Sequence, residues 1–128
     1  MLLDTTVLID VLRERRAAVD LLRGAFQQGP PPFVCAINVE EVWRGARARE
    51  EEAVSDLFAG LRVAPLGARE GKRAGNWRRD FSSRGVTLEQ ADCLIAAAAV
   101  GVGARLATGN PKDFPMSGLE IEHWPTGE

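Results

Sequence analysis

Residues 1–10 read MLLDTTVLID, a short apolar run that stops at Asp4 and passes into a helical pattern. The run over residues 1–3 predicts a buried strand. From Thr6 to Gln27 apolar residues recur near helical spacing, which predicts one helix over that range. A strand that leads directly into a helix is the repeating pattern of α/β proteins.

The same alternation continues along the rest of the chain. Further strands are predicted at residues 33–37, 62–66, 104–108 and 119–124. Helices are predicted from Asn38 to about residue 46, at 50–61, at 68–83, and from a cap at Thr87 to about residue 100. We therefore expect one α/β domain over residues 1–128, with a central, mainly parallel sheet of about five strands flanked by helices. In such sheets functional residues gather at the carboxyl ends of the strands.

Composition excludes several classes of protein. The chain has 128 residues, 45% apolar and 27% charged, as expected for one folded domain. Its net charge of −2 argues against coating nucleic acid by overall charge, but leaves a local basic surface open. The chain has a single histidine, His123, which excludes a histidine-rich metal site. Cys35 and Cys93 lie among apolar residues, which predicts that both thiols are buried. Neither a signal peptide nor a long apolar span is present, so we expect a soluble, cytoplasmic protein.

Asp92 is the sharpest single signal in the chain. The residues that follow it, CLIAAAAV, are apolar on every face of a helix, and such a helix is buried. A carboxylate there is costly unless it has a partner. Three explanations are open: the helix dipole stabilises the charge in the first turn, an arginine pairs with it, or the acid is functional.

Asp4 ends the first strand, and Glu41 lies near the start of the helix that follows the second. Asp4 either caps the next helix or points into the crevice, with Thr5 or Thr6 as the cap instead. Glu41 has the spacing of a capping box with Asn38, an alternative to a functional role. Carboxylates that converge without histidine or thiolate partners repel one another unless they are protonated or neutralised by cations. Hard oxygen ligands suit Mg²⁺ or Mn²⁺. Such ions support phosphodiester hydrolysis.

Residues 69–84 carry a local excess of positive charge. Six arginines and lysines there face only two acids, which is typical of a surface that holds a nucleic-acid backbone. Trp77 lies within this segment and either stacks on a base or packs into the core. A solvated arginine-rich face is the simpler explanation of the same pattern.

Four blocks of the chain resemble one protein family. Residues 2–10, LLDTTVLID, resemble the opening of PIN-domain ribonucleases, most closely the VapC-type toxins of bacterial toxin–antitoxin pairs. Residues 38–46, NVEEVWRGA, resemble the second block, in which a glutamate precedes a glycine by four positions, a spacing that selects Glu41 over Glu40. Residues 89–97, EQADCLIAA, and 107–114, ATGNPKDF, resemble the third and fourth blocks.

The resemblance implies a fold and an activity. The fold would be a PIN-like three-layer sandwich in which Asp4, Glu41 and Asp92 hold Mg²⁺ or Mn²⁺. A metal-bound water would hydrolyse RNA and leave 5′-phosphate and 3′-hydroxyl ends, which makes the protein an endoribonuclease toxin. The resemblance also implies a homodimer, and a cognate antitoxin whose C-terminal segment fills the groove and blocks the site.

Supporting residues follow from the same resemblance. Thr108 is implied to hold the crevice by hydrogen bonding, as are Thr5 or Thr6. Many family members carry a fourth acid where this chain has Asn110, and Asp113 is the alternative source of that charge.

Two other functions remain open. A catalytically degenerate PIN module that binds RNA or a protein partner would explain Asn110, and it would lack Mn²⁺-dependent stabilisation. A phosphatase of the haloacid-dehalogenase kind would need a second aspartate two residues after Asp4, where this chain has Thr6.

Overall fold

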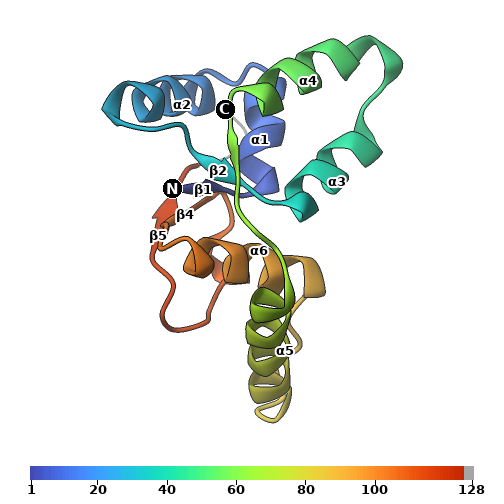
Figure 1. The fold of residues 1–128 in the computed structure, drawn as a ribbon, viewed down its shortest axis with the longest axis vertical. Helices are drawn as coiled ribbons and strands as arrows, with labels where there is room; N and C mark the ends of the chain where they lie inside the picture. Colours follow the sequence, from blue (N-terminus) through green and yellow to red (C-terminus); the bar gives the residue numbers. More distant parts are fainter. Residues whose placement is uncertain (126–128) are drawn as a thin grey trace.

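The structure is a computed structural model that describes residues 1–125 and alternates strands with helices (Figure 1). The strands are β1 (Leu2–Leu3), β2 (Phe33–Val34), β3 (Arg62–Val63), β4 (Leu106–Thr108) and β5 (Ile121–His123). The helices are α1 (Thr5–Leu12), α2 (Arg16–Gln28), α3 (Ala36–Gly45), α4 (Glu51–Ala59), α5 (Ala68–Ser82) and α6 (Gln90–Gly101). Two 3-10 turns, η1 (Ala48–Glu50) and η2 (Pro111–Asp113), complete the elements. No helix in this described part is long and apolar enough to cross a membrane.

The five strands form one parallel sheet in the order β3-β2-β1-β4-β5. Leu2 of β1 pairs with Phe33 on one side and with Leu106 on the other. The chain therefore builds outward from β1 in one direction and then returns to its other side. The point of reversal lies between β1 and β4, where ligands bind in open parallel sheets. The expected sheet of about five mainly parallel strands is confirmed.

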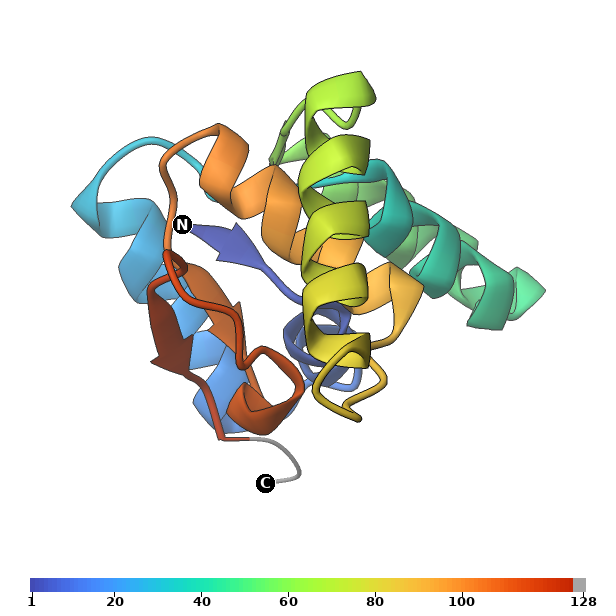
Figure 2. The ribbon, with the colours of Figure 1, turned by 90° about the horizontal axis from the view of Figure 1, so that it is seen from below.

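Alternate residues of the central strands face opposite sides of the sheet, which creates two apolar cores. Leu2 and Leu106 belong to the core beneath α5 and α6, whereas Leu3 and Ala107 belong to the core beneath α1 to α4. Figure 1 shows the resulting layers, with the sheet between the two groups of helices. In the view from below, α5 lies in front (Figure 2). This is the expected three-layer arrangement.

The predicted helix over residues 6–27 is wrong as a single element. The chain breaks it after Leu12, and Glu14 adopts a left-handed φ of 57° at the corner between α1 and α2. Buried Asp10 pairs with Arg15 across this corner at 3.4 Å. The apolar spacing runs through the corner without a glycine or proline, so periodicity alone hides the break.

Two predicted helix starts are also wrong. The helix predicted from Asn38 begins at Ala36, because the second strand ends at Val34 rather than at Ile37. The last helix is preceded by Glu89 rather than capped by Thr87, and no side chain caps it. The apolar character of α6 is as expected, since Ala96 to Ala99 are fully buried between the sheet and α5. Small side chains let these layers approach closely, and overfilling them would cost about 1–3 kcal/mol.

Candidate active site

Asp4 sits at the carboxyl end of β1 and is held by three hydrogen bonds. One carboxylate oxygen accepts from the Thr5 backbone N–H at 2.8 Å. The other accepts from the hydroxyl of Thr108 at 2.7 Å and from that of Thr6 at 3.1 Å. The side chain is only 4% exposed. Asp4 is therefore the N-cap of α1 and also a rigidly oriented acid beside β4.

The environment of Asp4 pulls its pKa in two directions. Burial raises the pKa above its ordinary value, and the negative charge of Glu41 adds to this. The hydrogen bonds from Thr108, Thr5 and Thr6 oppose the rise by favouring the charged form. The net direction is upward, so an anionic Asp4 would be stabilised by a nearby cation.

Glu41 is oriented by a chain of hydrogen bonds that starts at Asn38. The Asn38 amide nitrogen donates to the Thr5 hydroxyl at 3.1 Å, and that hydroxyl donates to Glu41 Oε1 at 2.6 Å. The amide oxygen of Asn38 accepts from the Cys35 backbone N–H at 2.8 Å. Asn38 is thus fully buried at the third position of α3, not at its cap, and it does not form a capping box with Glu41.

Asp92 lies in the first turn of α6, half-buried and close to the other acids. Burial raises its pKa to about 7, assisted by the negative charges of Asp4, Asp113, Glu41 and Glu89. The ion pairs found within residues 1–125 involve none of these five acids. An arginine partner for Asp92 is therefore not observed there.

The end of β4 and the residues after it are hydrogen-bonded to the end of β1 at this edge of the sheet. The Thr108 hydroxyl, which donates to Asp4, accepts from the Asn110 backbone N–H at 3.0 Å. The Gly109 backbone N–H donates to the hydroxyl of Thr6 at 3.1 Å. Asn110 itself is exposed, and its side chain makes no capping hydrogen bond to η2. The threonines therefore close the crevice between β1 and β4.

The structure brings Asp4, Glu41, Asp92 and Asp113 together, and we call these four residues the acid cluster. Asp113 is exposed on η2, yet its charge is the second largest electrostatic contribution to the pKa of Asp92. Among residues 1–125, the Asn110 side chain makes no hydrogen bond to a member of the acid cluster, and only its backbone N–H bonds to Thr108. The buried thiols of Cys35 and Cys93 have raised pKa values, chiefly because of burial, so both are poor ligands as they stand.

The oxygen donors of the acid cluster suit a hard divalent cation, although they do not form a complete coordination shell. Among residues 1–125, no three histidine, cysteine, aspartate or glutamate side chains are placed to hold one ion together. Mg²⁺ commonly takes only one or two carboxylates and completes its shell with water and substrate phosphate. Oxygen donors, mutual repulsion and the raised pKa of Asp92 match such an open site.

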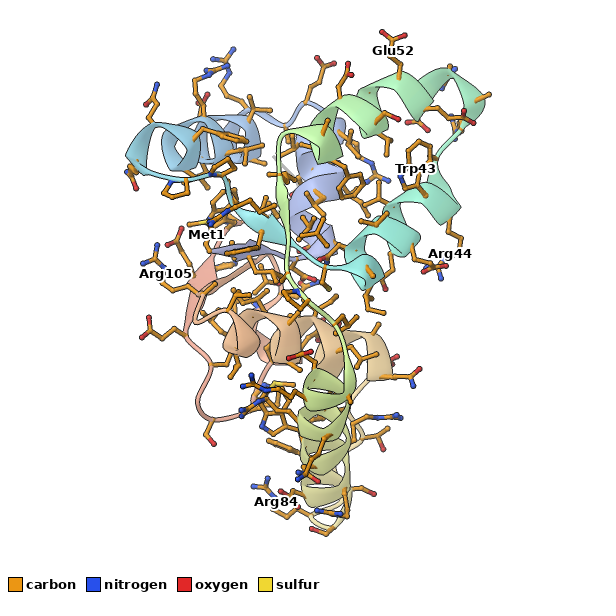
Figure 3. The ribbon with its side chains drawn as sticks, viewed as in Figure 1. Met1, Trp43, Arg44, Glu52, Arg84 and Arg105 are labelled. Carbon is orange, nitrogen blue, oxygen red and sulfur yellow. The ribbon has the colours of Figure 1, made fainter. Side chains whose placement is uncertain are left out.

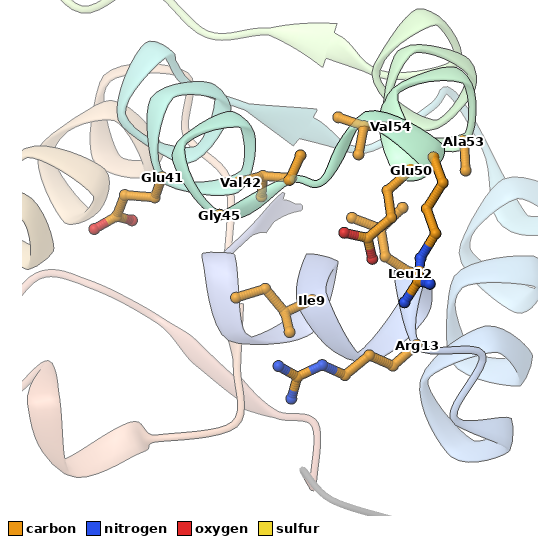
Figure 4. A pocket seen from close by; sticks show the side chains of 11 residues that line it. Ile9, Leu12, Arg13, Glu41, Val42, Gly45, Glu50, Ala53 and Val54 are labelled. Carbon is orange, nitrogen blue, oxygen red and sulfur yellow. The ribbon is translucent and has the colours of Figure 1, made fainter.

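A groove opens beside Glu41 between α1, α3 and α4 (Figure 4). Its volume is about 390 Å³, and its apolar lining includes Ile9, Leu12 and Val42. Arg13 and Glu50 stand at its polar side. Sequence reasoning did not locate this groove, because the facing apolar residues come from helices whose packing angle is not encoded in their spacing.

Comparison with known families gives a consistent result. The PIN-domain family model matches residues 1–115. Ribonuclease VapC10 of Mycobacterium tuberculosis is 35% identical over 116 residues, which cover 91% of this chain and 86% of the relative. Ribonuclease VapC19 of the same organism is 30% identical over 115 residues, covering 90% and 92% respectively.

Solved structures share the fold at lower sequence identity. The DNA-bound VapBC complex of Salmonella typhimurium contains a chain that superposes with a TM-score of 0.83 at 21% identity, covering 96% of both chains. A toxin–antitoxin complex from Klebsiella pneumoniae gives a TM-score of 0.81 at 24% identity, covering 98% of both chains.

Proposed function

Because this chain belongs to the PIN-domain family, together with the VapC ribonucleases, we propose that it is a metal-dependent endoribonuclease toxin held in check by a cognate antitoxin. The observation that carries this proposal is the convergence of Asp4, Glu41 and Asp92 without a cationic partner among the described residues. This placement raises the pKa of Asp92 to about 7. Acids kept this close repel one another unless one is protonated or a cation lies among them, and such arrangements are typical of functional sites.

Each residue has a distinct role in this proposal. Asp4, Glu41 and Asp92 would hold a divalent ion, Mg²⁺ or Mn²⁺, directly or through its bound waters, and the ion when bound would activate water and stabilise the leaving oxygen of an RNA phosphodiester. Thr108 and Thr6 fix the orientation of Asp4 through its second oxygen. Thr5, oriented by Asn38, directs Glu41. Preorganised ligands of this kind need no rearrangement when the substrate arrives.

The experiment that tests the activity is cleavage of end-labelled structured RNA by the antitoxin-free protein. Reactions with Mg²⁺, with Mn²⁺ and with EDTA are compared side by side. Discrete fragments that carry 5′-phosphate ends and disappear in EDTA support the proposal. RNA that stays intact with both metals, across a pool of transfer and ribosomal RNAs, contradicts it and favours a binding module without catalysis.

We assign the fourth acidic position to Asp113 rather than to Asn110. Asp113→Asn is expected to reduce cleavage about 10- to 100-fold, the usual cost of losing a charge that supports a metal site. Asn110→Ala, two positions after Thr108, changes no carboxylate and is expected to have a smaller effect. Rates measured at several Mn²⁺ concentrations check the assignment, and a larger loss in Asn110→Ala than in Asp113→Asn would reverse it.

Cleavage is expected to fall as pH drops below about 7. Asp92, with its pKa raised to about 7, then takes up a proton that competes with the divalent ion. Increasing Mn²⁺ should move the midpoint of this profile to lower pH, because the ion favours the carboxylate. A pH–rate series at two Mn²⁺ concentrations measures the shift, and a midpoint independent of Mn²⁺ would contradict it.

The antitoxin is proposed to occupy the groove beside Glu41 and so to cover the acid cluster. Its segment would place apolar side chains on Ile9, Leu12 and Val42. Two arginines and two glutamates also line this groove, so charged side chains of both signs in that segment would find partners. Glu41 belongs both to the groove and to the acid cluster. An antitoxin segment bound in the groove would therefore inhibit cleavage without a long-range conformational change.

Ala53→Arg should weaken antitoxin binding about 10- to 100-fold, because a long cationic side chain would fill the groove that Ala53 lines. RNA cleavage should change little, since Ala53 lies on α4 rather than in the acid cluster. Ala59→Arg is the matched control, an exposed alanine of the same helix outside the groove lining. Affinity is measured by titration calorimetry with purified antitoxin. Equal affinities of the two variants would contradict binding of the antitoxin in this groove.

Three further parts of the proposal rest on the family. The chain would act as a single nuclease domain over residues 1–128, form a homodimer, and work in the cytoplasm on cellular RNA. Sedimentation of the antitoxin-free protein tests the dimer directly.

A further inference from the structure

The charge of this protein is distributed very unevenly. The chain has a net charge of −2, yet α5 alone carries five cations, listed here in order: Arg69, Lys72, Arg73, Arg78 and Arg79. The helix has two acids, and one of them, Glu70, is buried, where it accepts from the Gly67 backbone N–H at 2.7 Å. The exposed surface of α5 is therefore strongly positive, with Asp80 as its one acid.

These cations are not used to stabilise the fold through ion pairs. The salt bridges within residues 1–125 involve arginines of other elements. Arg69, Lys72 and Arg73 line a hollow of about 420 Å³ on this helix together with Asn76, Trp77 and Asp80. The Arg73 guanidinium lies 5.9 Å from the centre of the Trp77 ring. Trp77 is partly buried and packs against the core, which is one of the two roles that the sequence left open for this residue.

The helix lies between the solvent and the element that carries Asp92. It packs on α6 as the outermost layer on that side of the sheet (Figures 1 and 2). Arg78 donates to the Leu88 backbone carbonyl at 3.3 Å, just before the start of α6. Arg84, which follows α5, lies at the far end of the molecule (Figure 3). The positive surface thus runs along α5, from Arg69 beside Gly101 at the end of α6 to Arg78 beside Leu88 just before its start.

An acidic site repels the polyanion that the proposed function requires it to cleave. A bound divalent ion would offset only part of this negative charge, so cations outside the cluster would add attraction and raise the local substrate concentration. We propose that the exposed face of α5 made by Arg69, Lys72 and Arg73 binds the phosphate backbone of RNA beyond the scissile bond. This inference rests on the proposed function and names the surface that recruits its substrate.

The test measures binding and cleavage separately. The variant Arg69→Gln, Lys72→Gln, Arg73→Gln is compared with Arg16→Gln, Arg23→Gln, Arg105→Gln, which removes the same charge from exposed arginines elsewhere. Binding of a fluorescent RNA of about 30 nucleotides is followed by anisotropy in EDTA, at several salt concentrations.

The α5 variant is expected to bind this RNA about 10- to 100-fold more weakly at low salt. Its slope of log affinity against log salt should be smaller in magnitude by about 2, because three contacts to single-stranded phosphates are lost. The control variant should stay within about twofold of the wild type. Equal affinity of the α5 variant and the wild type, or an equal loss in the control, would overturn the proposal. The first result would indicate that the face serves an acidic protein instead.

Cleavage kinetics distinguish failure of this inference from failure of the proposed function. With the long RNA, the α5 variant should show a raised KM and an unchanged kcat, since the acid cluster is intact. A fall in kcat with an unchanged KM would contradict a recruiting surface. If the wild type cleaves nothing, the proposed function fails, whereas the binding measurement in EDTA still decides whether α5 holds RNA.

Discussion

Asp92→Asn is expected to reduce metal-dependent RNA cleavage about 10²- to 10⁴-fold, equivalent to several kcal/mol of lost charge stabilisation. The same change should stabilise the metal-free protein. The amide has the shape of the carboxylate but removes its repulsion with Asp4, Asp113 and Glu41. We expect the Tm of the variant to rise by roughly 2 to 5 °C in EDTA.

The sign of this stability effect depends on pH. Since burial and neighbouring acids raise the pKa of Asp92 to about 7 from an ordinary value of 3.8, the folded state holds a proton between those values that the unfolded state releases. The wild type therefore loses stability at this site as pH rises from about 4 to about 7, and the loss is complete above about 7. The advantage of Asp92→Asn in EDTA should be largest at about pH 8 and shrink toward pH 5.

The control for this prediction is Glu40→Gln. Glu40 is an exposed acid on α3, next to Glu41 in the chain, and it pairs with Arg44 at 3.5 Å. Its replacement removes one negative charge without touching the acid cluster, so cleavage and Tm should both change little. Thermal melts and single-turnover cleavage rates measure the two effects. An active Asp92→Asn protein, or one that loses stability at pH 8, would contradict the assigned role.

Asn38→Ala is expected to damage stability and activity together. The truncation leaves the buried Cys35 N–H without its acceptor at 2.8 Å, which costs about 1–3 kcal/mol of unfolding free energy. It also frees the Thr5 hydroxyl, which then no longer directs Glu41. We expect cleavage to fall about 10- to 100-fold, a usual cost of losing a group that orients a ligand.

A purely structural role for Asn38 would lower stability alone. Leu22→Ala, a buried apolar truncation on α2, supplies the comparison, with an expected loss of about 2–5 kcal/mol. Rates are measured at a temperature where denaturation curves show both variants to be folded. Cleavage by Asn38→Ala at the rate of Leu22→Ala would mean that Asn38 only closes the first turn of α3.

Much of the sheet could be predicted from sequence because its strands are short apolar runs between helical patterns. The carboxyl ends of β1 and β4 were expected to carry function, and Asp4 lies there. An acid on an otherwise apolar helix singled out Asp92, and the structure places it where the charge of Asp4 raises its pKa. Such features could be read from sequence because burial and charge are properties of single residues and their immediate neighbours.

Features that depend on three-dimensional packing could not be predicted. The corner at Glu14 interrupts a periodic apolar pattern, and only its φ of 57° reveals it. Asn38 was expected at a helix start, yet its two hydrogen bonds join Cys35 to Thr5, which lie far apart in sequence. Asp4 proved to be both a cap and a member of the acid cluster, although the sequence offered these roles as alternatives.

A divalent-metal site at Asp4, Glu41 and Asp92 is tested by comparing Mn²⁺ binding to the wild type and to Asp92→Asn. Binding is measured by titration calorimetry and as the shift in melting temperature. A formed site stabilises the folded state in proportion to its occupancy. We expect Mn²⁺ to raise the Tm of the wild type above that of Asp92→Asn, the reverse of the order in EDTA. Equal responses of the two proteins to Mn²⁺, or no response from either, would contradict a metal site built on Asp4, Glu41 and Asp92.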